Sequence, residues 1–270
     1  MESDTSWSES TQHAGGELLV RRAPGAVEVS FNRPAKHNAF TDAMYDGLLE
    51  LCAQVRTERA VRVVVLRGAG GRAFAAGNDI SSFRSFTGAA DGVAYEARIR
   101  RVLDAISSLP QVTLAVVDGI CVGGGLAVAN ACDLRIGTPE ARFGYPIART
   151  LGNALSASIV RRCVDVFGDP LTREMLLTSR LVTAERAYAV GALLAVVPPG
   201  SMEAEVGSLV DGIRQAARVT ITVSKEQLRA DAGRYDAAAD DARLAAAYGG
   251  ADFREGVRAF LAKKPPQFRD

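Results

Sequence analysis

Two glycine-containing turns are the segments of this sequence best suited to chemistry. FAAGNDI (Phe74–Ile80) and GGGLAVANACDL (Gly123–Leu134) each follow an apolar run typical of a buried strand. The second turn leads into a predicted helix, whose first N–H groups have no intrahelical partner and stabilise negative charge. Two such turns on neighbouring strands would direct two N–H groups at one oxygen, which is the geometry of an oxyanion hole. The alternative is that these glycines serve only tight turns and close packing.

Other catalytic and cofactor motifs are missing from the sequence. The histidines are isolated (His13 and His37), and no G-x-S-x-G elbow or GxxxxGK[ST] phosphate loop occurs. The glycines at 119, 123, 124 and 125 do not form GxGxxG. The four cysteines form no CxxC pair, and no carboxylate and histidine cluster has metal-ligand spacing. We therefore expect no metal and no nucleotide cofactor.

Composition narrows the class of protein further. The chain has 270 residues, 48% of them hydrophobic, with 32 basic against 31 acidic residues and a net charge of +1. These values predict one large globular domain, with or without a small appendage, and exclude a disordered chain. The charge balance argues against partners such as nucleic acid or an acidic membrane surface.

Targeting signals are not expected either. The first 16 residues are polar and acidic, without the basic and apolar regions of a signal peptide. Leu114–Cys132 is nearly apolar and long enough to span a bilayer, but Asp118 and the GGG break favour a buried turn between two elements. We expect a cytoplasmic protein with no membrane contact.

The elements that must position the two turns alternate between strand and helix. ELLVRR and VEVSFN, joined by Pro24 and Gly25, predict a β-hairpin. Residues 41–58 have apolar side chains at helical spacing, with Thr41 or Asp42 as the N-cap. Val61–Gly68 and Val112–Gly119 predict buried strands, and shorter strands are expected in DLRIGTP and ARFGYP.

Three regions are expected along the chain. Residues 1–14 are predicted to be a flexible tail, and residues 15–197 an α/β core. After Pro198-Pro199-Gly200 the sequence becomes helical and is punctuated by glycine, so residues 198–270 are predicted to be a C-terminal helical region.

Read in order, several segments resemble one known family. They are VSFNRPAKHNAF, RAFAAGNDI, VDGICVGGGLAVANACDL, ARFGYP and EGVRAFLAKKPPQF. From about residue 17 to the end, the chain resembles the crotonase superfamily, the enoyl-CoA hydratases and isomerases. The resemblance implies a spiral of repeated ββα units, a C-terminal helical oligomerisation region, and a homotrimer or dimer of trimers. It also implies an acyl-CoA substrate, whose thioester enolate is stabilised, and no cofactor besides coenzyme A as part of that substrate.

The resemblance also assigns roles to single residues. The oxyanion donors fall on the backbone N–H groups of Asn78 and Gly124. The loop along the pantetheine continues through Asp79, Ile80 and Ser81, and the loop near the CoA nucleotide contains Ala35, Lys36 and Asn38. A C-terminal segment that reaches CoA on a neighbouring subunit falls on Phe260 and on Lys263 or Lys264, although a solvated helix end explains these lysines equally well.

The chain departs from the family at both usual catalytic glutamates. The family's first glutamate falls on Ala127, and its second falls on Ile147. Neither side chain can transfer a proton, and general acid–base help is worth roughly 10²–10⁴-fold. The GxIPGxGG loop is replaced by RTLGNALS. We therefore expect weak or absent hydratase activity of the usual kind.

Substitutes for these glutamates are few. Tyr145 is a candidate proton donor, or else a core aromatic residue. Asp79 is the carboxylate nearest to the predicted hole, and we interpret it as holding its loop. Asp91 and Glu96 are expected on a solvated helix face. The segment RTLGNALS contains three polar residues that either bind a polar acyl tail or cap the next helix. They are Arg149, Thr150 and Asn153.

Three functions follow from these patterns. The first is an enzyme that acts on acyl-CoA through an enolate, as a hydratase, isomerase, decarboxylase, hydrolase or other lyase. The second is a catalytically weak or inert CoA-binding protein. The third is RNA binding, which a rare branch of the superfamily achieves with a lysine-rich helix; here the corresponding residues 41–59 are mixed in charge.

Overall fold

The structure is a computed structural model that describes residues 6–229 and, beyond them, residues 251–252, 255, 258–259, 262, 264 and 266–268. The chain divides into two compact units, Met1–Gly207 and Ser208–Asp270. The division lies later in the sequence than the predicted boundary at residue 197. Throughout the described residues, every helix is too short or too polar to traverse a lipid bilayer.

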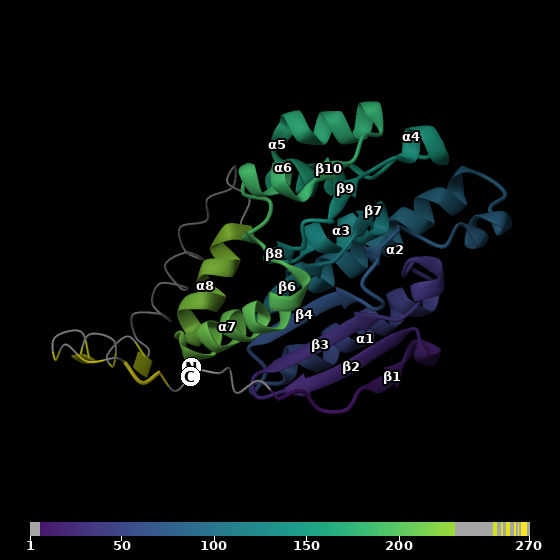
Figure 1. Ribbon diagram of the computed structural model, residues 1–270. Coiled ribbons are helices and arrows are strands. Elements are labelled where there is room, and N and C mark those ends of the chain that lie inside the picture. The colour runs from purple at the N-terminus through teal and green to yellow at the C-terminus, as the bar shows by residue number, and fades with distance from the viewer. Residues whose placement is uncertain are drawn as a thin grey trace. The chain divides into compact units, whose positions relative to one another are not determined.

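A seven-stranded sheet forms the larger layer of the first unit (Figure 1). Its order is β1-β2-β3-β4-β6-β8-β11, in which β1, β2 and β3 are antiparallel neighbours and the remaining pairs are parallel. Burial on both faces explains why its central strands are continuous runs of valine and leucine. The strands are Thr11–His13, Leu18–Ala23, Ala26–Phe31, Val63–Gly68, Val112–Val117, Leu134–Gly137 and Ala195–Val196.

A second sheet contains four short strands in the order β10-β9-β7-β5. The pairs β5 with β7 and β7 with β9 are parallel, and β10 is antiparallel to β9. In chain order these strands are β5 Ala73–Ala75, β7 Ile120–Val122, β9 Arg142–Gly144 and β10 Val182–Thr183.

Helices complete each repeat of the fold. A strand of the large sheet is followed by a strand of the small sheet and then by a helix, as in β4–β5–α2 and β6–β7–α3. The α-helices are α1 Asp42–Thr57, α2 Ala89–Ser107, α3 Gly124–Ala131, α4 Ile147–Thr150, α5 Ala157–Thr178, α6 Ala184–Ala189, α7 Met202–Gln215 and α8 Arg218–Arg229. The 3₁₀ helices are η1 Ala14–Gly16, η2 Pro34–Lys36, η3 Ile80–Ser85 and η4 Pro199–Ser201. The predicted α/β spiral of ββα units is confirmed.

Helix α1 begins where the sequence predicts. The Thr41 hydroxyl accepts a hydrogen bond from the Met44 N–H at 3.2 Å and so caps the helix. The apolar face of α1 is buried, including Tyr45, whose hydroxyl reaches the turn after β5. Helix α3 is buried on all sides, since every one of its residues from Gly124 to Ala131 is buried.

The predicted flexible tail over residues 1–14 is wrong for the part of it that the structure describes. Thr11–His13 form β1, paired with β2 in the register Thr11↔Val20, and the Ser8 N–H bonds to the Arg22 carbonyl at 2.7 Å. The Arg21 guanidinium lies 4.8 Å from the centre of the Trp7 ring. The polar sequence of this segment did not predict a strand. Strand β1 pairs with the open backbone groups at the edge of β2 and does not fill the core, so it needs no apolar pattern.

Gly119 occupies a turn that only glycine fits. It lies between β6 and β7 with φ of +69°, and a Cβ there would overlap the Arg72 carbonyl group. That carbonyl accepts a hydrogen bond from the Ile120 N–H at 3.1 Å, while the Gly119 carbonyl accepts one from Arg142 at 2.9 Å. The turn therefore holds three segments together and aims β7 into the small sheet.

We predict that Gly119→Ala lowers the free energy of unfolding by about 3 kcal/mol, because a Cβ meets both backbone strain and a fixed carbonyl. Gly92→Ala is the matched control. It lies within α2 with open space around it, so it should raise the free energy of unfolding by about 0.5–1 kcal/mol. Urea unfolding measures both, and equal effects of the two substitutions would contradict this account of the turn.

Candidate active site

The two predicted turns lie together at the ends of neighbouring strands. Strands β5 and β7 are parallel, with Ala75 paired to Cys121, so the turns that follow them meet at one edge of the small sheet. Gly77 and Gly123 have φ of +96° and +54°, and a Cβ on Gly123 would lie 3.3 Å from the Gly77 Cα. The two glycines therefore allow backbone to pack on backbone.

This packing leaves two backbone donors free. Phe40 donates to the Gly77 carbonyl at 2.9 Å and accepts from the Asp79 N–H at 2.8 Å, so the N–H of Asn78 between them takes no part. Gly124 is the first residue of α3, where an N–H has no intrahelical acceptor. In the described part of the chain, neither the Asn78 N–H nor the Gly124 N–H has a hydrogen-bond partner.

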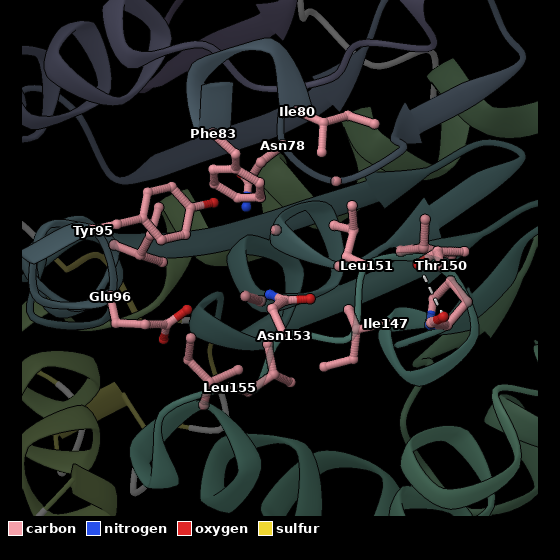
Figure 2. Close-up of a pocket in the computed structure, with 18 of the residues that line it drawn as sticks. Asn78, Ile80, Phe83, Tyr95, Glu96, Ile147, Thr150, Leu151, Asn153 and Leu155 are labelled. Carbon is pink, nitrogen blue, oxygen red and sulfur yellow. Dashed lines mark hydrogen bonds between the residues drawn. The ribbon is translucent and has the colours of Figure 1, made fainter. Parts of the chain in front are cut away.

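Both donors line one cavity of about 300 Å³ (Figure 2). Its walls are mostly apolar. They are formed by Ala76, Gly77, Asn78, Ile80, Phe83, Tyr95, Glu96, Ile99, Val122, Gly123, Gly124, Ala127, Pro146, Ile147, Thr150, Leu151, Asn153, Leu155 and Ile159. An oxygen atom at the donors would therefore be shielded from bulk water. Hydrogen bonds to a developing negative charge are stronger in such a shielded site than in water.

The two positions that lack glutamate face this same cavity. Ala127 lies on α3, one turn after Gly124, and Ile147 begins α4. Both side chains are apolar, so this part of the wall offers neither a proton donor nor a proton acceptor.

The structure removes Tyr145 as a candidate proton donor. Its side chain is fully buried and does not line the cavity. Burial raises the pKa of its hydroxyl well above the ordinary value, and Cys163 and Cys121 lie close enough to add to this shift. Tyr145 is a core aromatic residue, the second of the two alternatives that its sequence position allowed.

Two tyrosines missed by sequence reasoning lie near the Asn78 side chain, and one of them is hydrogen-bonded to it. The Tyr45 hydroxyl of α1 donates to the Asn78 Oδ1 at 2.6 Å. A Cβ on Gly124 would overlap that oxygen and would lie 2.7 Å from the Tyr45 hydroxyl, so Asn78 packs directly against the start of α3. Tyr95 of α2 points toward the Asn78 side chain from another direction (Figure 2). Burial raises the pKa of both tyrosines, which keeps their hydroxyls protonated.

Glu96 lies on the cavity wall, and its expected place on a solvated helix face is wrong. It is only partly exposed, and its Oε2 accepts a hydrogen bond from the Ser156 N–H at 3.0 Å. The buried residues of α2 could have indicated this, because Glu96 lies one turn before Ile99 and next to Tyr95. Asp91, on the same helix, instead accepts from the Thr87 and Gly88 N–H groups at the helix start.

The loop predicted to lie near the CoA nucleotide contains one buried and two exposed residues. Ala35 and Lys36 are exposed on η2. Asn38 is fully buried, and its side chain accepts from the Arg33 N–H and donates to the Ala69 and Ala73 carbonyls at 2.8–2.9 Å. The side chain of Asn38 therefore anchors this loop, and a contact between the loop and CoA stays a prediction.

Asp79 holds the loop that follows the first donor. Its carboxylate accepts from the Arg33 guanidinium at 2.8 Å and from the Ser81 N–H at 3.1 Å. The hydrogen bonds from Ser81 and Arg33 lower the pKa of Asp79 from the usual 3.8 to about 2. Of the two residues that follow, Ile80 lines the cavity and is half-exposed, while the side chain of Ser81 lies at the surface.

The remaining predicted residues divide as follows. Thr150 and Asn153 line the cavity, with the Thr150 hydroxyl donating to the Pro146 carbonyl at 3.0 Å, whereas Arg149 does not line it. Lys264 is exposed, and its N–H bonds to the Ala259 carbonyl at 3.0 Å. Phe260 and Lys263 lie outside the described residues.

The fold and this pair of donors define a class of protein, and comparison with known proteins identifies it. The family profile named Enoyl-CoA hydratase/isomerase matches residues 21–270, so the chain belongs to this family of the crotonase superfamily. A Thermus thermophilus protein named "Putative enoyl-CoA hydratase" is 33% identical over 93% of this chain and 100% of its own length. Methylmalonyl-CoA decarboxylase of Escherichia coli is 28% identical over 89% of this chain and 93% of its own length.

Solved structures agree with this assignment. The crystal structure of an enoyl-CoA hydratase/carnithine racemase from Magnetospirillum magneticum superimposes with a TM-score of 0.89 at 30% identity. The superposition covers 96% of this chain and 97% of that one. Members of the family that share this fold therefore differ in the reactions for which they are named.

Asn38→Ala is predicted to lower the free energy of unfolding by about 3 kcal/mol, because it removes the side-chain partner of one buried carbonyl, one partly buried carbonyl and one partly buried N–H. Lys36→Ala, two residues earlier and exposed, should change it by less than about 0.5 kcal/mol. Chemical denaturation tests the pair. A stable Asn38→Ala variant would show that the side chain does not anchor the loop.

Asp79→Asn is predicted to cost about 1 kcal/mol of folding free energy at pH 7, because the amide loses the charge that pairs with Arg33. The lowered pKa of Asp79 makes its contribution complete above pH 4 and lost as the pH falls toward 2. The stabilities of the two proteins should therefore converge in acid. As a control, Asp104→Asn removes an exposed pair with Arg162 and should have little effect at any pH. A pH-independent difference for Asp79→Asn would contradict the ionic role.

Proposed function

We propose that this protein acts on acyl-CoA thioesters by stabilising the enolate form of the acyl group. The observation that carries the proposal is the pair of unpartnered N–H groups, of Asn78 and Gly124, facing one largely apolar cavity. A thioester oxygen seated there gains negative charge as the enolate forms, and each such donor contributes roughly 3–4 kcal/mol to the transition state. Family membership supports the same chemistry.

The cavity favours a neutral, apolar acyl group. Ile80, Phe83, Ile147, Leu151 and Leu155 contribute branched or aromatic walls, and none of the described residues that line the cavity is lysine or arginine. A carboxylate on the acyl chain would thus find no cation, and it would meet Glu96. Apolar burial instead stabilises bound hydrocarbon by about 0.8 kcal/mol for each CH₂ group.

Hydration of enoyl-CoA is not the reaction that this site supports best. Water addition requires one group to activate the water and another to protonate Cα, and Ala127 and Ile147 supply neither. Reactions that need the enolate and a single proton-transfer group, such as double-bond isomerisation, make smaller demands on the cavity. We propose a reaction of this kind, without a metal or a cofactor besides the CoA of the substrate.

We also propose that the protein associates with copies of itself. Several large apolar side chains of the first unit are exposed on and around α5 and α6, namely Leu177, Leu181, Tyr188, Val190 and Leu194. We propose that these side chains belong to one interaction surface, since contiguous exposed apolar patches mark such surfaces. It supports a homotrimer or a dimer of trimers, the assemblies that the family resemblance implies.

A variant pair tests the donors. In a Tyr45→Phe/Asn78→Ala background, which removes the atoms nearest to Gly124, Gly124→Pro deletes one N–H at a helix position that tolerates proline. Gly124→Ala in the same background adds a similar side chain but keeps the N–H. We expect the proline variant to exchange the Cα protons of butanoyl-CoA with D₂O about 10²–10³-fold more slowly than the alanine variant. Equal rates would overturn the role of the Gly124 N–H.

Positions 127 and 147 carry alanine and isoleucine where the family has glutamate, which also favours a second candidate, a protein that binds acyl-CoA without turnover. Calorimetry with butanoyl-CoA and the decay of crotonyl-CoA absorbance separate the possibilities. Binding with Cα exchange but slow hydration supports the enolate enzyme. Binding without exchange supports the second candidate, and no binding contradicts both.

A further inference from the structure

We propose that Glu96 is the proton-transfer group of this cavity, in place of the two glutamates that Ala127 and Ile147 replace. The inference rests on the proposed function and extends it to a residue outside the family's usual catalytic positions. Among the described residues that line the cavity, Glu96 alone carries a carboxylate. In Figure 2 its side chain projects from α2 into the cavity, in the direction of Asn153.

The hydrogen bonding of Glu96 suits this role. Its Oε2 accepts from the N–H of Ser156, the N-cap of α5, at 3.0 Å. The hydroxyl of Ser156 makes no capping hydrogen bond, and the carboxylate from α2 accepts from the N–H of this N-cap residue, a donor that a residue of the helix itself satisfies in a capping box. The contact fixes one oxygen of Glu96, while Oε1 has no protein partner in the described part of the chain. An oriented carboxylate with one open oxygen is what a proton acceptor requires.

Two other acidic residues of this region, Asp79 and Asp91, form hydrogen bonds outside the cavity. Asp79 is paired with Arg33 and the Ser81 N–H and does not line the cavity. Asp91 accepts from Thr87 and Gly88 at the surface. Among the described residues, Glu96 is therefore the acid that lines the same cavity as the oxyanion donors.

The reaction balances without any co-reactant. The Cα–H bond of the acyl thioester breaks, and its proton passes to Oε1 of Glu96. The electron pair of that bond forms the enolate double bond, and charge moves onto the thioester oxygen between the Asn78 and Gly124 N–H groups. The proton on Glu96 exchanges with solvent, and Glu96 then delivers a solvent-derived proton to Cα, which gives Cα exchange, or delivers its proton to Cγ of an unsaturated chain, which moves the double bond.

The test follows the exchange of the Cα protons of butanoyl-CoA with D₂O by NMR, alongside calorimetric binding of the same compound. Glu96→Gln keeps an oxygen for the Ser156 N–H but cannot accept a proton. We expect exchange to fall about 10²-fold or more, while the dissociation constant changes by less than about threefold and Tm is retained. Glu50→Gln, at an exposed position on α1, is the matched control and should exchange at the wild-type rate.

Glu96→Ala separates catalysis from helix capping. A group that serves only as the cap of α5 predicts normal exchange in Glu96→Gln and a lowered Tm in Glu96→Ala. A proton-transfer group predicts that both variants lose exchange, and that only Glu96→Ala also loses stability.

The outcomes distinguish this inference from the proposed function. Exchange in Glu96→Gln within about threefold of wild type overturns the role of Glu96 and leaves the enolate chemistry standing. Wild-type protein that binds butanoyl-CoA without exchange overturns the role of Glu96 and leaves only acyl-CoA binding. Wild-type protein that does not bind butanoyl-CoA overturns the proposed function itself.

Discussion

The approach of the Gly77 turn to the Gly123 turn is the contact on which the rest of the site depends. Strands β5 and β7 run parallel, so their turns emerge at one edge of the small sheet, where a Cβ on Gly123 would lie only 3.3 Å from the Gly77 Cα. Positive φ at both glycines turns the chain so that the next residues, Asn78 and Gly124, present unpaired N–H groups. Leaving such groups unpaired costs folding free energy, which a bound oxyanion can recover.

Hydrogen bonds from distant parts of the chain hold this unfavourable arrangement. Tyr45 reaches Asn78 from α1, and Arg33 links Asp79 to Glu17 near the start of the large sheet. Asn38 anchors the loop between them to the ends of β4 and β5. Each of these side chains is polar, and each helps to hold the shape of the site, because its hydrogen-bonding groups are directed at the backbone or at one another.

The polar groups of the cavity are distributed differently from those implied by the family resemblance. The wall formed by Ala127 and Ile147 is apolar, and a carboxylate appears instead on α2, bonded to the start of α5. For the acyl-CoA substrate that we propose, moving the charged group from one wall to another would change which carbon of the acyl chain it faces. Chains of one fold can in this way share the enolate intermediate and differ in the bond that they make or break.

The sequence by itself determined the repeating strands, the helix that begins at Thr41, the two glycine turns and the apolar replacements at 127 and 147. These features are local, since burial periodicity, capping and turn chemistry act within a few residues. Only the tertiary structure decided that Tyr145 and Asn38 are internal, that Thr11–His13 form an edge strand, and that Glu96 faces the cavity. The physical reason is that the partner of each residue lies far away in the chain: Ala69 and Ala73 for Asn38, and Ser156 for Glu96. No local pattern encodes where a half-buried polar side chain points, because packing between repeats decides whether it meets solvent, core or cavity.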